Sequence, residues 1–148
     1  GIIGGKEDEI IFEKSLIPTI FDCIKFVEQT DIDLFAPAIG TSHGIYNNDP
    51  NISWELVKQL KTNIEIPLVL HGCSGLDTKT INKLIKNNFL KINFATGIRQ
   101  VFLSGILDTV NKTDGIIKPQ KYLREGRFRV YEFLNEIFSL HLEIHSNN

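Results

Sequence analysis

The chain has 148 residues, of which 42% are hydrophobic and 23% charged, and its formal net charge is -2. This size and composition are typical of one soluble globular domain. Because the sequence has no apolar run of membrane-spanning length and no basic cluster, we expect no membrane and no nucleic-acid partner. The two cysteines, Cys23 and Cys73, are too few for a disulfide framework and favour a cytoplasmic location.

Helices and short apolar strands alternate along the chain. In chain order, the patterns predict a helix over 19–29, a strand over 33–39, a helix over 53–63, a strand over 67–70, a helix over 78–87, a strand over 90–95, and helices over 97–110 and 119–140. Thr19 and Ser53 are suited to N-caps, and Pro119 fits a first helical turn, whereas Pro37 is unfavourable inside a strand. We expect one domain over 1–140 and a flexible tail over 141–148.

This alternation predicts a parallel α/β fold, because strands buried on both faces are joined by crossover helices. Three strands are fewer than a doubly wound domain of this size usually has, and they match part of an eight-stranded barrel. The chain has no Met and opens with the glycine-rich segment 1–5. We therefore expect a piece of a longer chain that begins just after a strand.

Polar, glycine-containing loops follow the three predicted strands. They contain His43, His71 and Asn93, and ligands bind at the carboxyl ends of parallel strands. Two imidazoles on neighbouring strand ends can bind one metal ion. Either histidine alone could equally make a structural hydrogen bond, but the pair, each beside a glycine, favours a metal site.

Glycine and hydroxyl residues precede two of the predicted helices. Ser74 and Gly75 lie before one, and Thr96 and Gly97 lie before another. Free backbone N–H groups at such positions bind phosphate, although these residue types also serve as ordinary turn and cap residues. The opening loop contains Glu7, and a carboxylate in a surface loop is most often only solvated.

Taken together, the strings GGKED, AIGTSHGIY, PLVLHGCSGL and KINFAT resemble the carboxyl-terminal half of the class II, zinc-dependent ketose-bisphosphate aldolases. The resemblance extends from Gly1 to about Arg129. It implies the carboxyl-terminal half of a (β/α)8 TIM barrel, with strands six to eight and an extra C-terminal helix. It also implies a homo-oligomer, a dimer or a tetramer, when the protein is complete.

The resemblance implies a role for each matching residue. His43 and His71 match zinc ligands, Asn93 matches the asparagine that contacts the enediolate, and Glu7 matches a mobile-loop proton carrier. The residues that match the loops for phosphate and for a monovalent cation, Na⁺ or K⁺, are Gly44, Gly72, Ser74 and Thr96.

The implied reaction is reversible cleavage of fructose or tagatose 1,6-bisphosphate to dihydroxyacetone phosphate and glyceraldehyde 3-phosphate. Zinc draws the developing charge onto oxygen, an amide supports it, and a loop carboxylate moves the proton. One alternative is a truncated or degenerate module that binds metal or phosphate without catalysis. Another is a doubly wound domain that binds sugar phosphates without zinc.

The sequence also departs from the family pattern. The third zinc histidine and a catalytic aspartate belong to the family's amino-terminal half, which this sequence does not include. Cys73 replaces the second glycine of the usual HGGSG, and Ala95 replaces an acidic residue that often precedes the phosphate-binding threonine. Lys118-Pro119-Gln120 replaces a DPR string, so the guanidinium that binds a phosphate there is missing.

Overall fold

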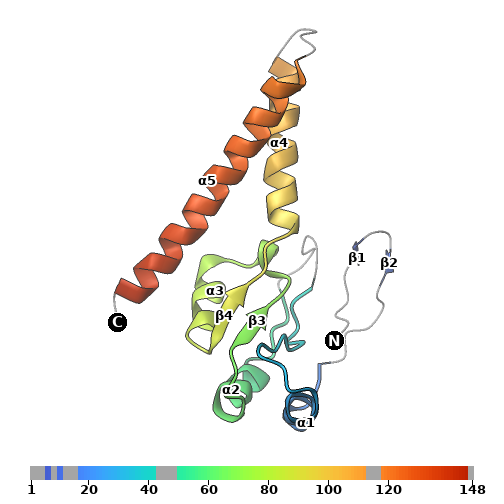
Figure 1. Cartoon of the computed structure of the whole chain (residues 1–148), viewed down its shortest axis with the longest axis vertical. Helices are drawn as coiled ribbons and strands as arrows, with labels where there is room; N and C mark the ends of the chain where they lie inside the picture. Colours follow the sequence, from blue (N-terminus) through green and yellow to red (C-terminus); the bar gives the residue numbers. More distant parts are fainter. Residues whose placement is uncertain (1–5, 8–9, 12–16, 43–49, 113–117, 147–148) are drawn as a thin grey trace. The chain divides into compact units, whose positions relative to one another are not determined.

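The computed structural model describes residues 6–7, 10–11, 17–42, 50–112 and 118–146, with side chains for 17–42, 50–112 and 118–139. The chain divides into two compact units, residues 1–94 and 95–148. The first unit is mixed α/β, and the second is formed by two long helices (Figure 1).

The described part of the first unit contains three α-helices: α1 (Ile20–Thr30), α2 (Trp54–Asn63) and α3 (Thr78–Ile85). Thr19 and Asp22 form a capping box at the start of α1, and Ser53 accepts a hydrogen bond from the backbone N–H of Leu56 in α2. These caps confirm the predicted starts of both helices. Helix α3 begins after Asp77 and ends two residues before the predicted Asn87.

Two parallel strands lie side by side in the first unit, β3 (Leu68–Leu70) and β4 (Phe89–Ile92) (Figure 1). Helix α3 connects them, as the βα alternation predicts. The prediction of a strand over 33–39 is wrong, because only an isolated parallel bridge joins Phe35 to Leu68. Pro37 has no backbone N–H to donate, and Gly40 has a φ of 101°, so the segment cannot continue regular pairing.

The core of the first unit lies between the strands and the helices. Leu60, Leu68 and Leu84 are fully buried and come from α2, β3 and α3 respectively. Cys23 and Phe35 bring α1 and the bridged segment into the same cluster. This core fixes the carboxyl ends of β3 and β4 relative to each other.

Near the start of the chain, β1 (Lys6–Glu7) pairs antiparallel with β2 (Ile10–Ile11). The sequence predicted an irregular loop here. The backbone of Glu7 instead pairs with that of Ile10, in a hairpin that the short opening segment gave no reason to predict.

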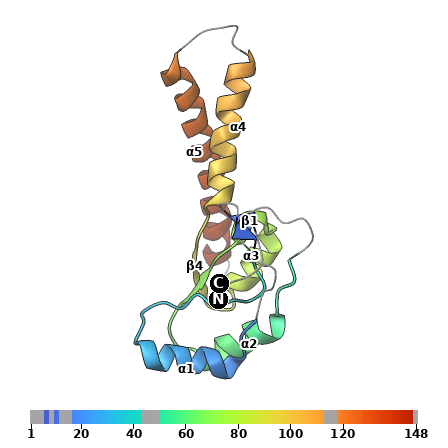
Figure 2. The same cartoon turned by 90° about the vertical axis from the view of Figure 1, so that its right-hand side faces the viewer.

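The second unit consists of α4 (Thr96–Lys112) and α5 (Pro119–Ser146), which run antiparallel beside each other (Figure 2). A Cβ atom added at Gly105 or Gly126 would lie within 3.0 Å of the facing helix, so the two helices approach closely at these glycines. Helix α5 reaches Ser146, six residues past its predicted end at Leu140. Most of the expected tail is therefore helical, because 141–146 contain neither glycine nor proline to end the helix.

None of the helices in the described part of the chain combines the length and the apolar composition that a membrane crossing requires.

Candidate functional site at the strand ends

The side chains of His71 and Asn93 meet at the carboxyl ends of β3 and β4. The Nδ2 atom of Asn93 lies 3.2 Å from Nε2 of His71. The backbone N–H of Asn93 donates to the carbonyl of Leu70 at 3.0 Å, so the parallel pairing continues to the residue just before His71. Two of the residues predicted to form the site are therefore held together by the sheet itself.

Lys91 fixes which way the Asn93 amide points. Its Nζ atom, which can only donate, hydrogen-bonds to Oδ1 of Asn93. The amide nitrogen must then face His71, and because that nitrogen also only donates, Nε2 of His71 is the acceptor. In this arrangement the Asn93 amide occupies the Nε2 lone pair of His71, so a metal ion would have to replace that hydrogen bond to bind at Nε2.

Cys73 ties the loop after β3 to the end of β4. Its thiol donates to the backbone carbonyl of Asn93, with Sγ 2.7 Å from the oxygen. Burial raises the pKa of Cys73 to about 12, so the group stays a protonated thiol at neutral pH. Cys73 is therefore a structural donor that holds the backbone of Asn93, and not a nucleophile.

Gly72 packs directly against the end of the preceding segment. It has a φ of 67°, and a Cβ atom at this position would lie 2.3 Å from the backbone oxygen of Ser42. Only glycine fits this conformation and this space. The close approach places the loop after β3 against Ser42, the residue just before His43 in the sequence.

The other predicted site residues are distributed as follows. Ser74 lies in a 3₁₀ turn, η1 (Cys73–Gly75), and α3 is capped by Asp77 and not by Ser74 or Gly75. Thr96 is the first residue of α4 in the second unit. The backbone of Glu7 lies in β1, but its side chain is outside the described residues, as are His43 and Gly44.

Of the two predicted zinc ligands, His71 lies within the described residues. His71 is exposed at its strand end and is a residue type that binds zinc, although its Nε2 atom accepts from Asn93 in this structure. No group of three or more His, Cys, Asp or Glu side chains that could hold a metal ion occurs among the described residues. The predicted partner ligand, His43, lies outside them.

Sequence reasoning missed the contributions of Lys91 and Cys73. Lys91 lies two residues before Asn93, and residues i and i+2 of a strand share a face, so alternation along the strand could have identified it. The hydrogen bond from Cys73 to Asn93 joins residues 20 apart in the sequence, and no local pattern predicts it.

Comparison with known proteins supports the resemblance seen in the sequence. The family model for class-II fructose-bisphosphate aldolase matches residues 1–144. A fructose-bisphosphate aldolase from Staphylococcus aureus is 33% identical over 132 residues, which are 89% of this chain and 46% of that protein. A fructose-bisphosphate aldolase from Staphylococcus epidermidis is 32% identical over 132 residues, which are again 89% of this chain and 46% of that protein. The chain spans about half the length of the curated relatives it matches.

Solved structures give the same result. The YdjI aldolase from Escherichia coli K12 is 29% identical, with a TM-score of 0.69 over 83% of this chain and 44% of that one. A putative fructose-1,6-bisphosphate aldolase from Coccidioides immitis is 18% identical, with a TM-score of 0.72 over 93% of this chain and 48% of the other. The second likeness concerns the fold alone.

Proposed function

Because the chain belongs to the class-II fructose-bisphosphate aldolase family and has part of a (β/α)8-barrel fold, we propose that it forms the carboxyl-terminal half of an aldolase active site. The reaction is reversible cleavage of a ketose 1,6-bisphosphate to dihydroxyacetone phosphate and glyceraldehyde 3-phosphate. The observation that carries this proposal is the meeting of His71 and Asn93 at the ends of two parallel strands.

His71 and His43 would hold Zn²⁺. When bound, a zinc ion is a Lewis acid that stabilises negative charge on an adjacent oxygen. The contact between Gly72 and Ser42 supports this pair, because it brings the loop that contains His71 against the residue before His43. The remaining ligand is expected from the half of the family fold that this sequence does not include.

Asn93 would donate its amide N–H to the enediolate oxygen of the substrate. Lys91 hydrogen-bonds to Oδ1 of the same amide, which fixes the amide plane and strengthens its N–H as a donor. Cys73 holds the backbone of Asn93 at the same time. Held from both sides, the donor needs little rearrangement as charge develops on the substrate.

Glu7 would move the proton at the reacting carbon of dihydroxyacetone phosphate. A carboxylate on the segment of β1 suits general acid–base work if the segment closes over the substrate. The phosphate and a monovalent cation, Na⁺ or K⁺, would bind at the residues that match the family loops: Gly44, Gly72, Ser74 and Thr96.

The proposal also covers the domain organisation, the compartment and the oligomeric state of the protein. We assign residues 1–140 to a single barrel domain in the complete protein, which acts in the cytoplasm as a homo-oligomer. The two cysteines, Cys23 and Cys73, are both buried and free, as a reducing compartment favours.

The test is aldol cleavage by the complete product of the gene, with fructose and tagatose 1,6-bisphosphates as separate substrates. We expect cleavage of one or both, lost on chelation and restored by zinc. His71→Ala should lose zinc and cleavage together, whereas Lys58→Ala, an exposed change on α2, should lose neither. Zinc retention without cleavage in the unmodified protein would instead favour the non-catalytic binding module.

A further inference from the structure

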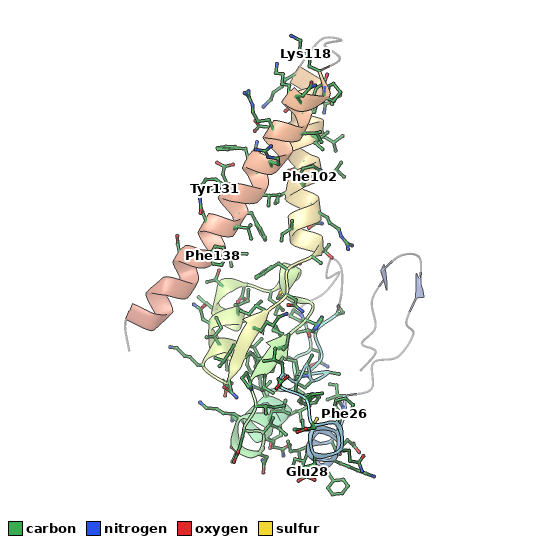
Figure 3. All side chains as sticks on the ribbon, in the orientation of Figure 1. Phe26, Glu28, Phe102, Lys118, Tyr131 and Phe138 are labelled. Carbon is green, nitrogen blue, oxygen red and sulfur yellow. The ribbon has the colours of Figure 1, made fainter. Side chains whose placement is uncertain are left out.

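A polar hollow lies between α4 and α5, at the end of the helix pair where α5 begins and which Lys118 marks in Figure 3. Its volume is ≈ 280 Å³, just below the ~300–1,000 Å³ of most ligand pockets, so it has room for a small molecule or ion. All of the residues that line it are polar or charged. The charged ones are Asp108 and Lys112 of α4 and Lys121, Arg124, Glu125 and Arg129 of α5.

The charges around the hollow favour an anion. Four of the lining residues are basic and two are acidic. Arg129 lies against both acidic residues, with Nη2 3.3 Å from Oδ2 of Asp108 and Nε 3.7 Å from Oε1 of Glu125. One guanidinium therefore offsets much of the repulsion that the two carboxylates would exert on an anion.

Lys112, Lys121 and Arg124 supply the excess positive charge of the hollow. None of the three forms an ion pair with another residue that the structure describes. Lys121 and Arg124 are three residues apart and share one face of α5, whereas Lys112 belongs to the last turn of α4. Charged donors from two helices can surround a tetrahedral oxyanion, which accepts several hydrogen bonds at once.

The position of Lys121 is unfavourable for the helix that contains it. Lys121 lies in the first turn of α5, which contains no acidic residue. The positive end of the helix dipole lies at this turn and repels a cation. An anion bound beside Lys121 would remove that repulsion, so the charge distribution of α5 suits a helix with a bound anion better than one without.

The hollow is separate from the loops that are proposed to bind the phosphate of the substrate. Asp108 and Lys112 lie 12 and 16 residues after Thr96 along α4. At 1.5 Å per residue, these spacings correspond to about 18 and 24 Å. One phosphate group therefore cannot contact both Thr96 and the hollow.

We propose that the hollow binds a phosphate dianion, either inorganic phosphate or the phosphate group of a small phosphomonoester. Two negative charges match the excess of two positive charges among the lining residues, and Lys112, Lys121 and Arg124 donate to the phosphate oxygens. The bound ion joins the last turn of α4 to the first turns of α5. Binding therefore stabilises the helix pair.

Phosphate titrations of the full 148-residue chain test the proposal. Amide chemical shifts, followed by NMR as inorganic phosphate is added at low salt, should move for residues 108–112 and 121–129. The dissociation constant should lie below about 1 mM and should rise as potassium chloride is added. Glycerol phosphate, titrated in the same way, distinguishes the two sources. Tighter binding than that of inorganic phosphate identifies a phosphomonoester as the ligand, and equal or weaker binding identifies the free ion.

Two double variants that lose the same charge locate the site. Lys121→Gln combined with Arg124→Gln should raise the dissociation constant for phosphate at least about tenfold, because it removes two charged donors. Lys58→Gln combined with Arg127→Gln, exposed changes outside the hollow, should leave it within about twofold of the unchanged chain. Circular dichroism checks that both variants keep their helices.

Three results would overturn the proposal: binding weaker than about 1 mM in the unchanged chain, an equal loss of affinity in the two double variants, or chemical-shift changes at Ser74 and Thr96 in place of those around the hollow. The last result would place the phosphate in the loops of the proposed catalytic site. It would thus support the proposed function while excluding the hollow as a phosphate site.

Discussion

Asn93 is the residue on which the contacts of the candidate site converge. Its side chain contacts His71 and accepts from Lys91, and its carbonyl accepts from the buried thiol of Cys73. These three contacts orient the amide of Asn93, and a substitution at the partner residue can remove each of them separately.

The thiol of Cys73 should make stability depend on pH above neutrality. Burial raises its pKa to about 12 from an ordinary 9.0. Below pH 9 both folded and unfolded chains hold the proton; between 9 and 12 only the folded chain does. The free energy of unfolding therefore falls by about 1.4 kcal/mol per pH unit in that range. Because Cys73→Ala lacks this dependence, its stability deficit relative to the unchanged chain should shrink by about 2 kcal/mol from pH 8 to 10.5.

Urea unfolding at the two pH values measures this change. Leu84→Ala is the matched control, since it removes a buried side chain that does not titrate, and its deficit should stay constant. A Cys73→Ala deficit that is equally constant would contradict the assignment of a buried, protonated thiol.

Glu7 is tested by removing its ability to carry a proton. In the complete enzyme, Glu7→Gln should lower the exchange of dihydroxyacetone phosphate's proton with solvent and the rate of cleavage by about 10²–10⁴-fold. Zinc content and substrate affinity should stay nearly unchanged, because the change leaves the proposed metal and phosphate contacts in place. Undiminished exchange with zinc retained would show that Glu7 is only a loop carboxylate.

At the scale of elements, glycine decides how closely α4 and α5 pack. A Cβ atom at Gly126 would lie 2.9 Å from both the ring and the backbone oxygen of Phe102. The ring can move aside, but the backbone oxygen can do so only if the helices separate. The helix pair therefore depends on a residue with low intrinsic helix propensity.

Gly126→Ala should accordingly destabilise the helix pair, although alanine favours helix by about 1 kcal/mol over glycine. We expect overpacking to outweigh that gain and to give a net loss of about 1–2 kcal/mol. Thermal unfolding followed by circular dichroism measures the loss. Arg127→Ala, an exposed change one residue along α5, should stay within about 0.5 kcal/mol of the unchanged chain. A stabilised Gly126→Ala variant would disprove the close approach.

At the scale of the whole molecule, the small sheet has an open side. Within the described residues β4 pairs only with β3, and Leu90 on β4 is 57% exposed. In a closed barrel every strand has two neighbours. The family fold thus requires further strands to complete the sheet.

Zinc binding by the isolated chain should therefore be weak and should need both histidines. Two imidazoles occupy two of the four coordination positions of a tetrahedral zinc ion, whereas catalytic sites usually provide three protein ligands. Titration of the 148-residue chain with zinc should give a dissociation constant far above the nanomolar range, and His43→Ala or His71→Ala should abolish binding. Nanomolar binding that persists in His71→Ala would refute the assignment of these two ligands.

The sequence by itself determined the elements that rest on local physics. Thr19 and Ser53 start their helices because their side chains bond to backbone N–H groups three residues on, and the βα alternation correctly predicted β3 and β4 as parallel neighbours. The motif strings likewise indicated the class-II fructose-bisphosphate aldolase family, to which the match of the family model assigns the chain. The placement of His71 near Asn93 followed from the rule that parallel strands end at one edge.

Only the tertiary structure decided the features that depend on residues far apart in the chain. The segment over 33–39 makes a single bridge because Pro37 lacks a donor, and Gly72 is required because Ser42 approaches it across the sheet edge. The hydrogen bond from Cys73 to Asn93 and the close packing of Gly126 on Phe102 likewise join separate elements. Such contacts depend on how elements pack in three dimensions, and no local periodicity encodes that packing.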